Sequence, residues 1–382
     1  MNSIKVLCLQ GLIFLVCLEV LSFVGSQLGV FLVNETPYFY RSQSQNSVSV
    51  HDARTEEKDW GAWRRIHSSA VQSSECFRVE INANEVGARD DSFLSNTDSD
   101  IILLGDSFAE GWGVSQDKTA QALIERYIKK RLLNFGSAGN FGPLQHLIIY
   151  EQLASKYLHE EVLVFFLPAN DFTDNERSHW ENAPLTSKMR YRPYFGRDGD
   201  ALRPWYFPEA QPTDRFGYYD GKFSDTAESD GRGIFASHLK KILVNFTWLS
   251  NPLRSLSYIL LHSEKSAQSY YLSASAEEEI NIIAVYEKLS SLAAGRPLNI
   301  VVIPTEKDIR GLQGSSGELL QNLTWYAGLK RIAESSGGSF IDLLEYVPND
   351  YASLFHDCDA HWSVEGNLWA AAEVAKQLME GK

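Results

Sequence analysis

Ser107 lies shortly after a run of four apolar residues, 101–104. Residues 101–113 read IILLGDSFAEGWG, so four branched apolar residues lead directly into Gly105, Asp106 and Ser107. Such a run predicts a strand that is buried on both faces, and Gly105 lets the backbone turn sharply after it. We expect Ser107 at or near the first turn of a helix, whose free N–H groups favour developing negative charge. The alternative is that Ser107 is only the N-cap of that helix.

A serine hydroxyl is a poor nucleophile until a base removes its proton, and that base needs an acid to orient it. His361 is the candidate base, and it lies in the stretch 357–362, DCDAHW, just before the last predicted helix. In an extended lead-in, residues two apart point the same way. This geometry favours Asp359 as the acid, and Asp357 stays open as the alternative.

Attack by a serine also requires hydrogen-bond donors for the oxyanion that forms. Three donors are candidates: the backbone N–H of Ser107, the N–H of Gly139 in the stretch 134–139 (NFGSAG), and the side-chain amide of Asn170. Each lies in a loop that follows a predicted strand. Because ligands bind at the carboxyl edge of an open α/β sheet, these loops can converge on one site.

A metal site is the competing interpretation of the C-terminal motif. Its ligands would be five side chains crowded into six residues, namely His356, Asp357, Cys358, Asp359 and His361. This interpretation leaves the Ser107 stretch without a role. We therefore expect neither a metal nor a cofactor.

Predicted strands and helices alternate along most of the chain, which implies right-handed crossovers and a mostly parallel sheet. A long insertion, about 172–272, interrupts the pattern. Its first half carries ten aromatic residues between 180 and 219, which form either a sugar-binding platform or the insertion's own core. Its second half, 234–262, has helical periodicity. The predicted strands are 76–82, 101–104, 132–135, 162–167, 298–303 and 340–343, and the predicted helices are 117–131, 143–157, 276–292, 319–334 and 364–379.

The N-terminus is apolar and long enough to span a bilayer, from Val6 to Val24. Lys5 precedes it, which favours a cytoplasmic N-terminus, although Glu19 is a costly residue within such a span. We favour an uncleaved anchor over a signal peptide cut near Ser26. Both alternatives export the rest of the chain, to a periplasmic or extracytoplasmic location. The expected organisation is an anchor at 1–33, a linker and lead-in at 34–96, and a catalytic domain at 97–382.

Charge and cysteine content narrow the classes of partner. The chain has 382 residues and a net charge of −14, and nothing resembles a basic face, so nucleic acid is not expected as a partner. Four cysteines are too few for a disulfide scaffold. Cys76 and Cys358 could pair, and could equally be buried thiols.

Four short blocks of the sequence are residues 105–107, 134–139, 170–171 and 359–361. Together they resemble the sequence motifs of the SGNH hydrolases, also called the GDSL family, and they occur in the family's order. The resemblance covers about 97–378, and the stretch after Asp171 is unmatched. It implies a flavodoxin-like three-layer α/β/α sandwich with a five-stranded sheet. It also implies that Ser107 is the nucleophile and His361 the base, with Gly139 and Asn170 completing the oxyanion hole.

The sequence departs from the family's pattern at two positions. Pro168 stands where the third block usually has a glycine, and Cys358 stands where the fourth block usually has its aspartate, three residues before the histidine. The order Asp359, Ala360, His361, Trp362 resembles a variant seen in SGNH-like proteins of bacterial polysaccharide modification. That resemblance also assigns the acid to Asp359.

The expected function is that of an exported, membrane-anchored serine esterase. It would remove or transfer an O-acyl group, with acetyl expected, on a carbohydrate through an acyl-enzyme on Ser107. Hydrolase and acyltransferase share these residues. The alternatives are a lipid ester hydrolase and a non-catalytic SGNH-like protein of polysaccharide assembly.

Overall fold

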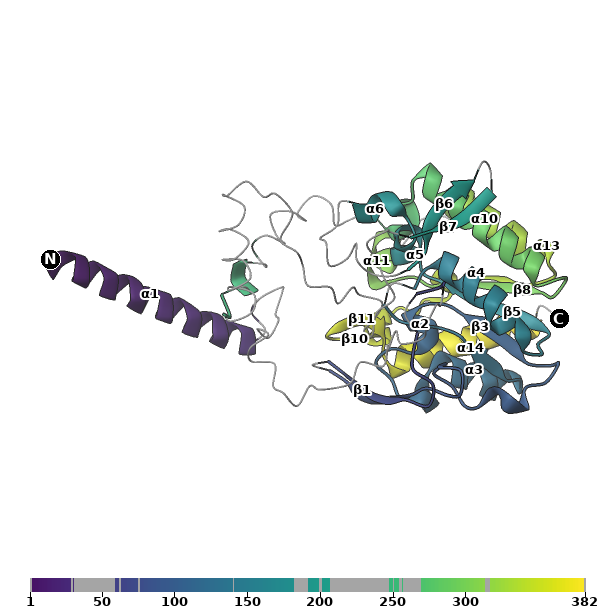
Figure 1. Ribbon diagram of the computed structural model, residues 1–382, viewed down its shortest axis with the longest axis horizontal. Helices are drawn as coiled ribbons and strands as arrows, with labels where there is room; N and C mark the ends of the chain where they lie inside the picture. Colours follow the sequence, from purple (N-terminus) through teal and green to yellow (C-terminus); the bar gives the residue numbers. More distant parts are fainter. Residues whose placement is uncertain are drawn as a thin grey trace. The chain divides into compact units, whose positions relative to one another are not determined.

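The structure is a computed structural model of the chain (Figure 1). It describes residues 2–28, 30, 59–61, 63–74, 76–139, 141–181, 192–198, 201–206, 247–249, 251–253, 256, 269–312 and 317–380. The chain divides into two units. One comprises Met1–Ser47 with Lys222–Ala267, and the other comprises Val48–Gly221 with Gln268–Lys382.

A five-stranded parallel sheet organises the second unit. Its strands lie in the order β4-β3-β5-β8-β9. Counted along the chain this order is 2-1-3-4-5, the flavodoxin-like arrangement of doubly wound sheets. The strands are β3 (Ile101–Leu104), β4 (Leu132–Asn134), β5 (Glu161–Phe166), β8 (Leu298–Val302) and β9 (Phe340–Asp342). The predicted α/β class and parallel sheet are confirmed.

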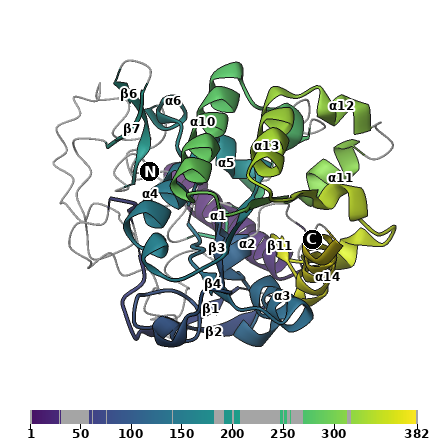
Figure 2. The same cartoon turned by 90° about the vertical axis from the view of Figure 1, so that its right-hand side faces the viewer.

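Helices cover both faces of this sheet (Figure 2). Successive residues of a strand point to opposite faces, so Ile102 and Leu104 belong to one buried cluster, while Ile101 and Leu103 belong to another. The first cluster includes residues of α4 (Pro143–Gln152), α10 (Ala276–Leu292) and α13 (Thr324–Ser335). The second includes residues of α3 (Ala120–Ile128) and α14 (Val364–Glu380). The predicted three-layer α/β/α sandwich is confirmed.

Three predicted helices have different bounds in the structure. The helix predicted over 117–131 is shorter, because α3 ends at Ile128 before Lys129 with a left-handed backbone, and a separate 3-10 turn, Gln116–Lys118, precedes it. The helix predicted over 319–334 is interrupted, because Leu323 has an extended backbone with ψ 130° between α12 (Gly317–Gln321) and α13. The helix predicted over 143–157 ends at Gln152 and is followed by a short 3-10 turn, Ala154–Lys156. Apolar spacing continues across both interruptions, which explains why the sequence pattern did not reveal them.

The lead-in contributes to the main core. Residues 34–96 were predicted as a linker and lead-in, but the described part, from residue 59 onward, is folded. An antiparallel hairpin joins β1 (Ser69–Ser73) and β2 (Arg78–Asn82), and Trp60, Trp63 and Phe93 are buried in the cluster that covers one face of the sheet. Burial of large aromatic side chains is strongly favourable, so this stretch packs on the core and does not remain a solvated linker.

The described part of the insertion has a small core of its own. It contains α5 (Pro168–Asp174), α6 (Arg177–Glu181) and the hairpin of β6 (Tyr194–Asp198) with β7 (Ala201–Trp205). Its core is Tyr194, which is buried against Trp180 and Trp205, whereas Phe195 is buried in the same cluster as residues of α4, α10 and α13. For these residues the structure supports packing. Residues 207–246, which hold several of the aromatics and much of the predicted second-half helix, lie outside the described residues.

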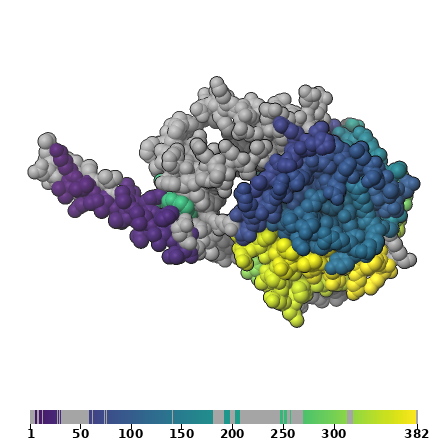
Figure 3. Space-filling view, turned by 90° about the horizontal axis from the view of Figure 1, so that it is seen from below, coloured from purple at the N-terminus to yellow at the C-terminus, as the bar shows by residue number. Residues whose placement is uncertain are grey.

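The first unit contains the N-terminal helix α1 (Asn2–Gln27). In the described part of the chain, its window Leu9–Ser26 is the stretch that is long and apolar enough to cross a membrane, a property that signal sequences share. Trp248, Leu249 and Asn251 contact its C-terminal part, where the green atoms meet the purple helix in Figure 3. Helix α11 (Glu306–Leu312) belongs to the second unit.

Candidate active site

Ser107 is the first residue of α2 (Ser107–Glu110), which begins directly after β3. The N-cap of α2 is Asp106, whose carboxylate accepts a hydrogen bond of 2.9 Å from the backbone N–H of Phe108. The alternative that Ser107 is only an N-cap is therefore wrong. Gly105 has φ +156°, and a Cβ there would lie 2.6 Å from the Cβ of Ala109. This close approach explains the glycine at the turn.

His361 lies within hydrogen-bond distance of Ser107. It belongs to β11 (Asp359–Trp362), which pairs with β10 (Phe355–His356) in a short hairpin ahead of α14. Its Nε2 is 2.7 Å from Ser107 Oγ, and its Nδ1 is hydrogen-bonded to Asp359 Oδ1. Because a carboxylate only accepts, Nδ1 carries the proton and Nε2 is left to accept the serine proton. The structure thus brings the predicted nucleophile, base and acid into one hydrogen-bonded chain.

Asp359 accepts hydrogen bonds on both carboxylate oxygens. Oδ1 accepts the backbone N–H of His361 at 3.1 Å as well as its ring N–H, and Oδ2 accepts the indole N–H of Trp112 at 3.2 Å. Burial raises the pKa of Asp359, but these hydrogen bonds outweigh it and hold the pKa below its ordinary value. The Trp112 ring also lies 5.5 Å from the His361 ring.

Trp112 is a site residue that the sequence analysis did not identify. It stands in the quoted stretch 101–113, but its hydrogen-bond partner lies 247 residues away. The alternative acid, Asp357, is exposed at the turn of the hairpin, and within the described residues its carboxylate has no hydrogen bond to His361. The geometry therefore favours Asp359.

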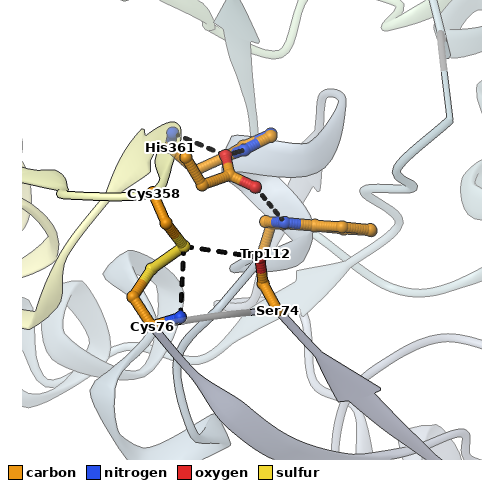
Figure 4. The surroundings of a disulfide bond; sticks show 6 residues. Ser74, Cys76, Trp112, Cys358 and His361 are labelled. Atoms are coloured by element: carbon orange, nitrogen blue, oxygen red, sulfur yellow. Dashed lines mark hydrogen bonds and ion pairs between the residues drawn. A yellow bond between two sulfur atoms is a disulfide. The ribbon is translucent and has the colours of Figure 1, made fainter. Parts of the chain in front are cut away.

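A disulfide joins Cys76 to Cys358, with an S–S distance of 2.07 Å. It ties the loop between β1 and β2 to the residue directly before Asp359 (Figure 4). Of the two alternatives for these cysteines, pairing is the one in the structure. The disulfide also removes Cys358 from the alternative metal cluster. Among the described residues no group of three or more histidine, cysteine or acidic side chains is placed to hold a metal ion.

The loop that carries Gly139 is attached to α2. The side-chain amide of Asn134 donates to the carbonyl of Ala109 at 2.7 Å, and the backbone N–H of Ala138 donates to the Glu110 carboxylate. Gly139 follows directly and has a left-handed backbone, φ +97°. These bonds place the predicted oxyanion loop beside the helix that begins with the nucleophile.

Asn170 lies in the first turn of α5, directly after β5. Its side-chain N–H donates to Asp106 Oδ2 at 3.2 Å, so its amide is held next to the residue that precedes Ser107. Burial raises the pKa of Asp106 to about 6. Pro168 is in the first turn of α5, where a proline lacks no needed N–H. Pro168 therefore fits the start of a helix in place of the family's glycine.

Two buried arginines of the lead-in bind α2 and the loops next to it. Arg64 pairs with the Glu110 carboxylate at 2.9 Å and donates to the carbonyl of Gly136 at 2.8 Å. Arg89 donates to the carbonyls of Glu110 at 3.0 Å and Val114 at 2.6 Å. Sequence reasoning missed these residues, because their partners are distant in the chain and no local pattern marks them.

The described side chains around Ser107 pack closely. The space between them is too small for a water molecule. Much of its lining is aromatic, and the lining residues are Ser107, Phe108, Gly111, Trp112, His361, Trp362 and Asn367.

A scan of protein-family models finds no match to the chain, and a search of curated proteins finds none either. Solved structures similar to it include a lipase/acylhydrolase from Enterococcus faecalis, at 10% identity and a TM-score of 0.35, covering 74% of this chain and 96% of that one. A G-D-S-L family lipolytic protein from Veillonella parvula DSM 2008 has 11% identity, a TM-score of 0.33, and coverage of 74% and 98%. The lipase Lip_vut3 from a goat rumen metagenome is 10% identical, with a TM-score of 0.35, and the match covers 73% of this chain and 97% of that one. At these TM-scores the likeness alone does not assign an activity.

Proposed function

We propose that this chain is an exported, membrane-anchored serine esterase that removes or transfers a short O-acyl group, such as acetyl, on a carbohydrate. The observation that carries the proposal is the hydrogen-bonded chain of Ser107, His361 and Asp359. A serine hydrogen-bonded to a histidine, which is in turn hydrogen-bonded to an aspartate, is the catalytic triad that activates a serine hydroxyl.

In the proposed reaction, Ser107 Oγ attacks the ester carbonyl while His361 Nε2 takes the hydroxyl proton. Asp359 stabilises the imidazolium that forms. The oxyanion receives the Ser107 N–H at the start of α2, with Gly139 and Asn170 as further donors. His361 then gives its proton to the leaving alkoxide, which leaves an acyl-enzyme. Water or an acceptor hydroxyl attacks that ester, and its proton returns through His361 to Ser107.

One observation supports the substrate class. The order of residues 359–362 resembles SGNH-like proteins that modify bacterial polysaccharides. The described insertion aromatics pack against their neighbours, so they add no support for a sugar platform.

The test combines a fluorophosphonate probe with ester turnover. The wild-type chain should become labelled on one serine and should hydrolyse acetyl esters. Ser107→Ala should abolish labelling and lower turnover by about 10⁴-fold or more. The matched control is Ser115→Ala, an exposed serine nearby, which should behave as the wild type. Labelling that survives Ser107→Ala would overturn the proposed nucleophile.

A substrate panel then tests the class of ester. Acetylated sugars should be turned over faster than long-chain lipid esters, with an acceptor sugar added to detect transfer. Preference for the lipid esters would replace the carbohydrate assignment with that of a lipid ester hydrolase. A folded wild-type chain that neither reacts with the probe nor turns over any ester would support a non-catalytic assembly protein instead.

A further inference from the structure

The apolar helix α1 carries one carboxylate, Glu19, within the window Leu9–Ser26. Apolar side chains along α1 are exposed in the structure; Leu21, for example, is 66% exposed. Such a helix needs an apolar environment, which a bilayer supplies. A carboxylate in that environment is expensive unless something pairs with it. The partner of Glu19 is therefore informative.

Both carboxylate oxygens of Glu19 accept backbone hydrogen bonds from the distant insertion. The N–H of Trp248 donates at 2.8 Å and the N–H of Leu249 at 3.3 Å. An unpaired peptide N–H costs several kcal/mol in hydrocarbon, and so does an unpaired carboxylate. The contact therefore satisfies the Glu19 carboxylate and two backbone N–H groups, which lie more than 200 residues away in the sequence.

Further contacts extend the pairing toward the end of the window. The rings of Phe23 and Trp248 lie 5.2 Å apart at 71°, and the side-chain amide of Asn251 donates to Ser26 Oγ at 2.8 Å. Glu19, Ser22 and Ser26 recur at helical spacing, and Ser22 and Ser26 are buried, so one side of the last two turns of α1 is covered. Asn251 is buried as well. Figure 1 shows the green segment beside the C-terminal end of α1.

Other apolar side chains of α1, and two leucines that follow Asn251, are exposed. Val20 and Val24 are exposed on the helix, and Leu253 and Leu256 are 51% and 54% exposed on the segment. A tryptophan at the end of the span is typical of the membrane–water interface. With Lys5 on the cytoplasmic side, this end of α1 faces the exported side of the membrane.

We propose that residues 247–249, 251–253 and 256 form a second membrane contact, in which Trp248, Leu249 and Asn251 dock on the outer end of α1 while Leu253 and Leu256 insert into the outer leaflet of the bilayer. The inference rests on the membrane anchoring in the proposed function and extends it to the insertion. Cleavage near Ser26 would remove Glu19 and Phe23, the partners of Trp248. The docked contact thus requires that α1 is not cleaved from the chain.

The test places an environment-sensitive NBD label on single cysteines in the full-length chain, reconstituted in phosphatidylethanolamine–phosphatidylglycerol vesicles. Cys8→Ser and Cys17→Ser are made in every variant, and the native disulfide is left intact. Labels at Leu253→Cys and Leu256→Cys should be quenched by doxyl-labelled lipids and shielded from aqueous iodide. A label at Leu94→Cys, which is 86% exposed in the other unit, is the matched control and should show the reverse.

A second variant tests the role of Glu19. Glu19→Leu keeps α1 apolar but removes both acceptors, so the label at 253 should move from lipid toward water while the chain stays in the membrane. Equal access of iodide to positions 253, 256 and 94 would overturn the proposal. A soluble product whose N-terminus lies near Gln27 would instead overturn the anchor itself. Fractionation and N-terminal sequencing separate that failure from the first.

Discussion

The substitution Asp359→Asn tests the proposed acid most sharply, because the structure allows its effect to be worked out donor by donor. Asp359 receives three N–H groups: the ring and backbone N–H of His361 on Oδ1, and the indole N–H of Trp112 on Oδ2. A carboxylate can accept all three. An asparagine offers one oxygen and one NH₂ group, so it cannot.

The asparagine has two orientations, and each leaves one donor facing another. With its oxygen toward His361, the NH₂ group meets the Trp112 N–H. With its oxygen toward Trp112, the NH₂ group meets the His361 backbone N–H and donates to Nδ1, which moves the ring proton to Nε2. Nε2 then cannot accept the Ser107 proton. We therefore expect Asp359→Asn to lower turnover by about 10²–10⁴-fold.

Trp112→Phe changes the balance between these orientations. It removes the clash from the productive orientation and a hydrogen bond from the unproductive one. Each unsatisfied donor costs about 1–3 kcal/mol, so the loss from Asp359→Asn should shrink by about tenfold or more in the Trp112→Phe background. Trp112→Phe alone should cost less than about tenfold, because the carboxylate still accepts both His361 donors.

The assay is a double-mutant cycle of kcat and kcat/KM on an acetyl ester, with circular dichroism to check folding. Asp357→Asn is the matched control, and its loss should stay below about tenfold because its carboxylate is exposed. An equal loss from Asp359→Asn in both backgrounds would refute the donor analysis. A large loss from Asp357→Asn alone would show that Asp357 is the acid.

Three further predictions concern stability. Glu110→Gln should lower the free energy of unfolding by about 3–5 kcal/mol, because it leaves the buried Arg64 charge unpaired; a loss below about 1 kcal/mol in urea denaturation would contradict this. Cys358→Ser should cost about 2–5 kcal/mol, and reducing agent should lower the Tm of the wild type but not of the variant; a wild-type Tm unchanged by reduction would contradict this. Burial raises the pKa of Asp106 from 3.8 to about 6, so between these pH values the folded chain keeps a proton that the unfolded chain has lost, and stability falls as the pH rises. Asp106→Asn keeps the N-cap and should gain in stability relative to the wild type between pH 4.5 and 7.5, whereas a constant difference would show that Asp106 is ionised throughout.

The sequence by itself determined the frame of the fold and the candidates for chemistry. Continuous apolar runs such as 101–104 and 162–167 predict buried strands, because side chains on both faces of a central strand must leave water. The structure has β3 and β5 there. Helical spacing predicted α10 at its observed bounds, Ala276–Leu292. These signals are local, so they can be read without knowing what packs against them.

Only the tertiary structure decided which distant groups meet. The partners of Asp359 include Trp112, 247 residues away, and the disulfide joins residues 282 apart. Glu19, a costly residue in the sequence of a membrane span, finds its hydrogen bonds 229 residues further on. Such contacts have no periodic signature in the chain. They depend on how strands and loops cross in space, which local propensity and hydrophobic pattern do not encode.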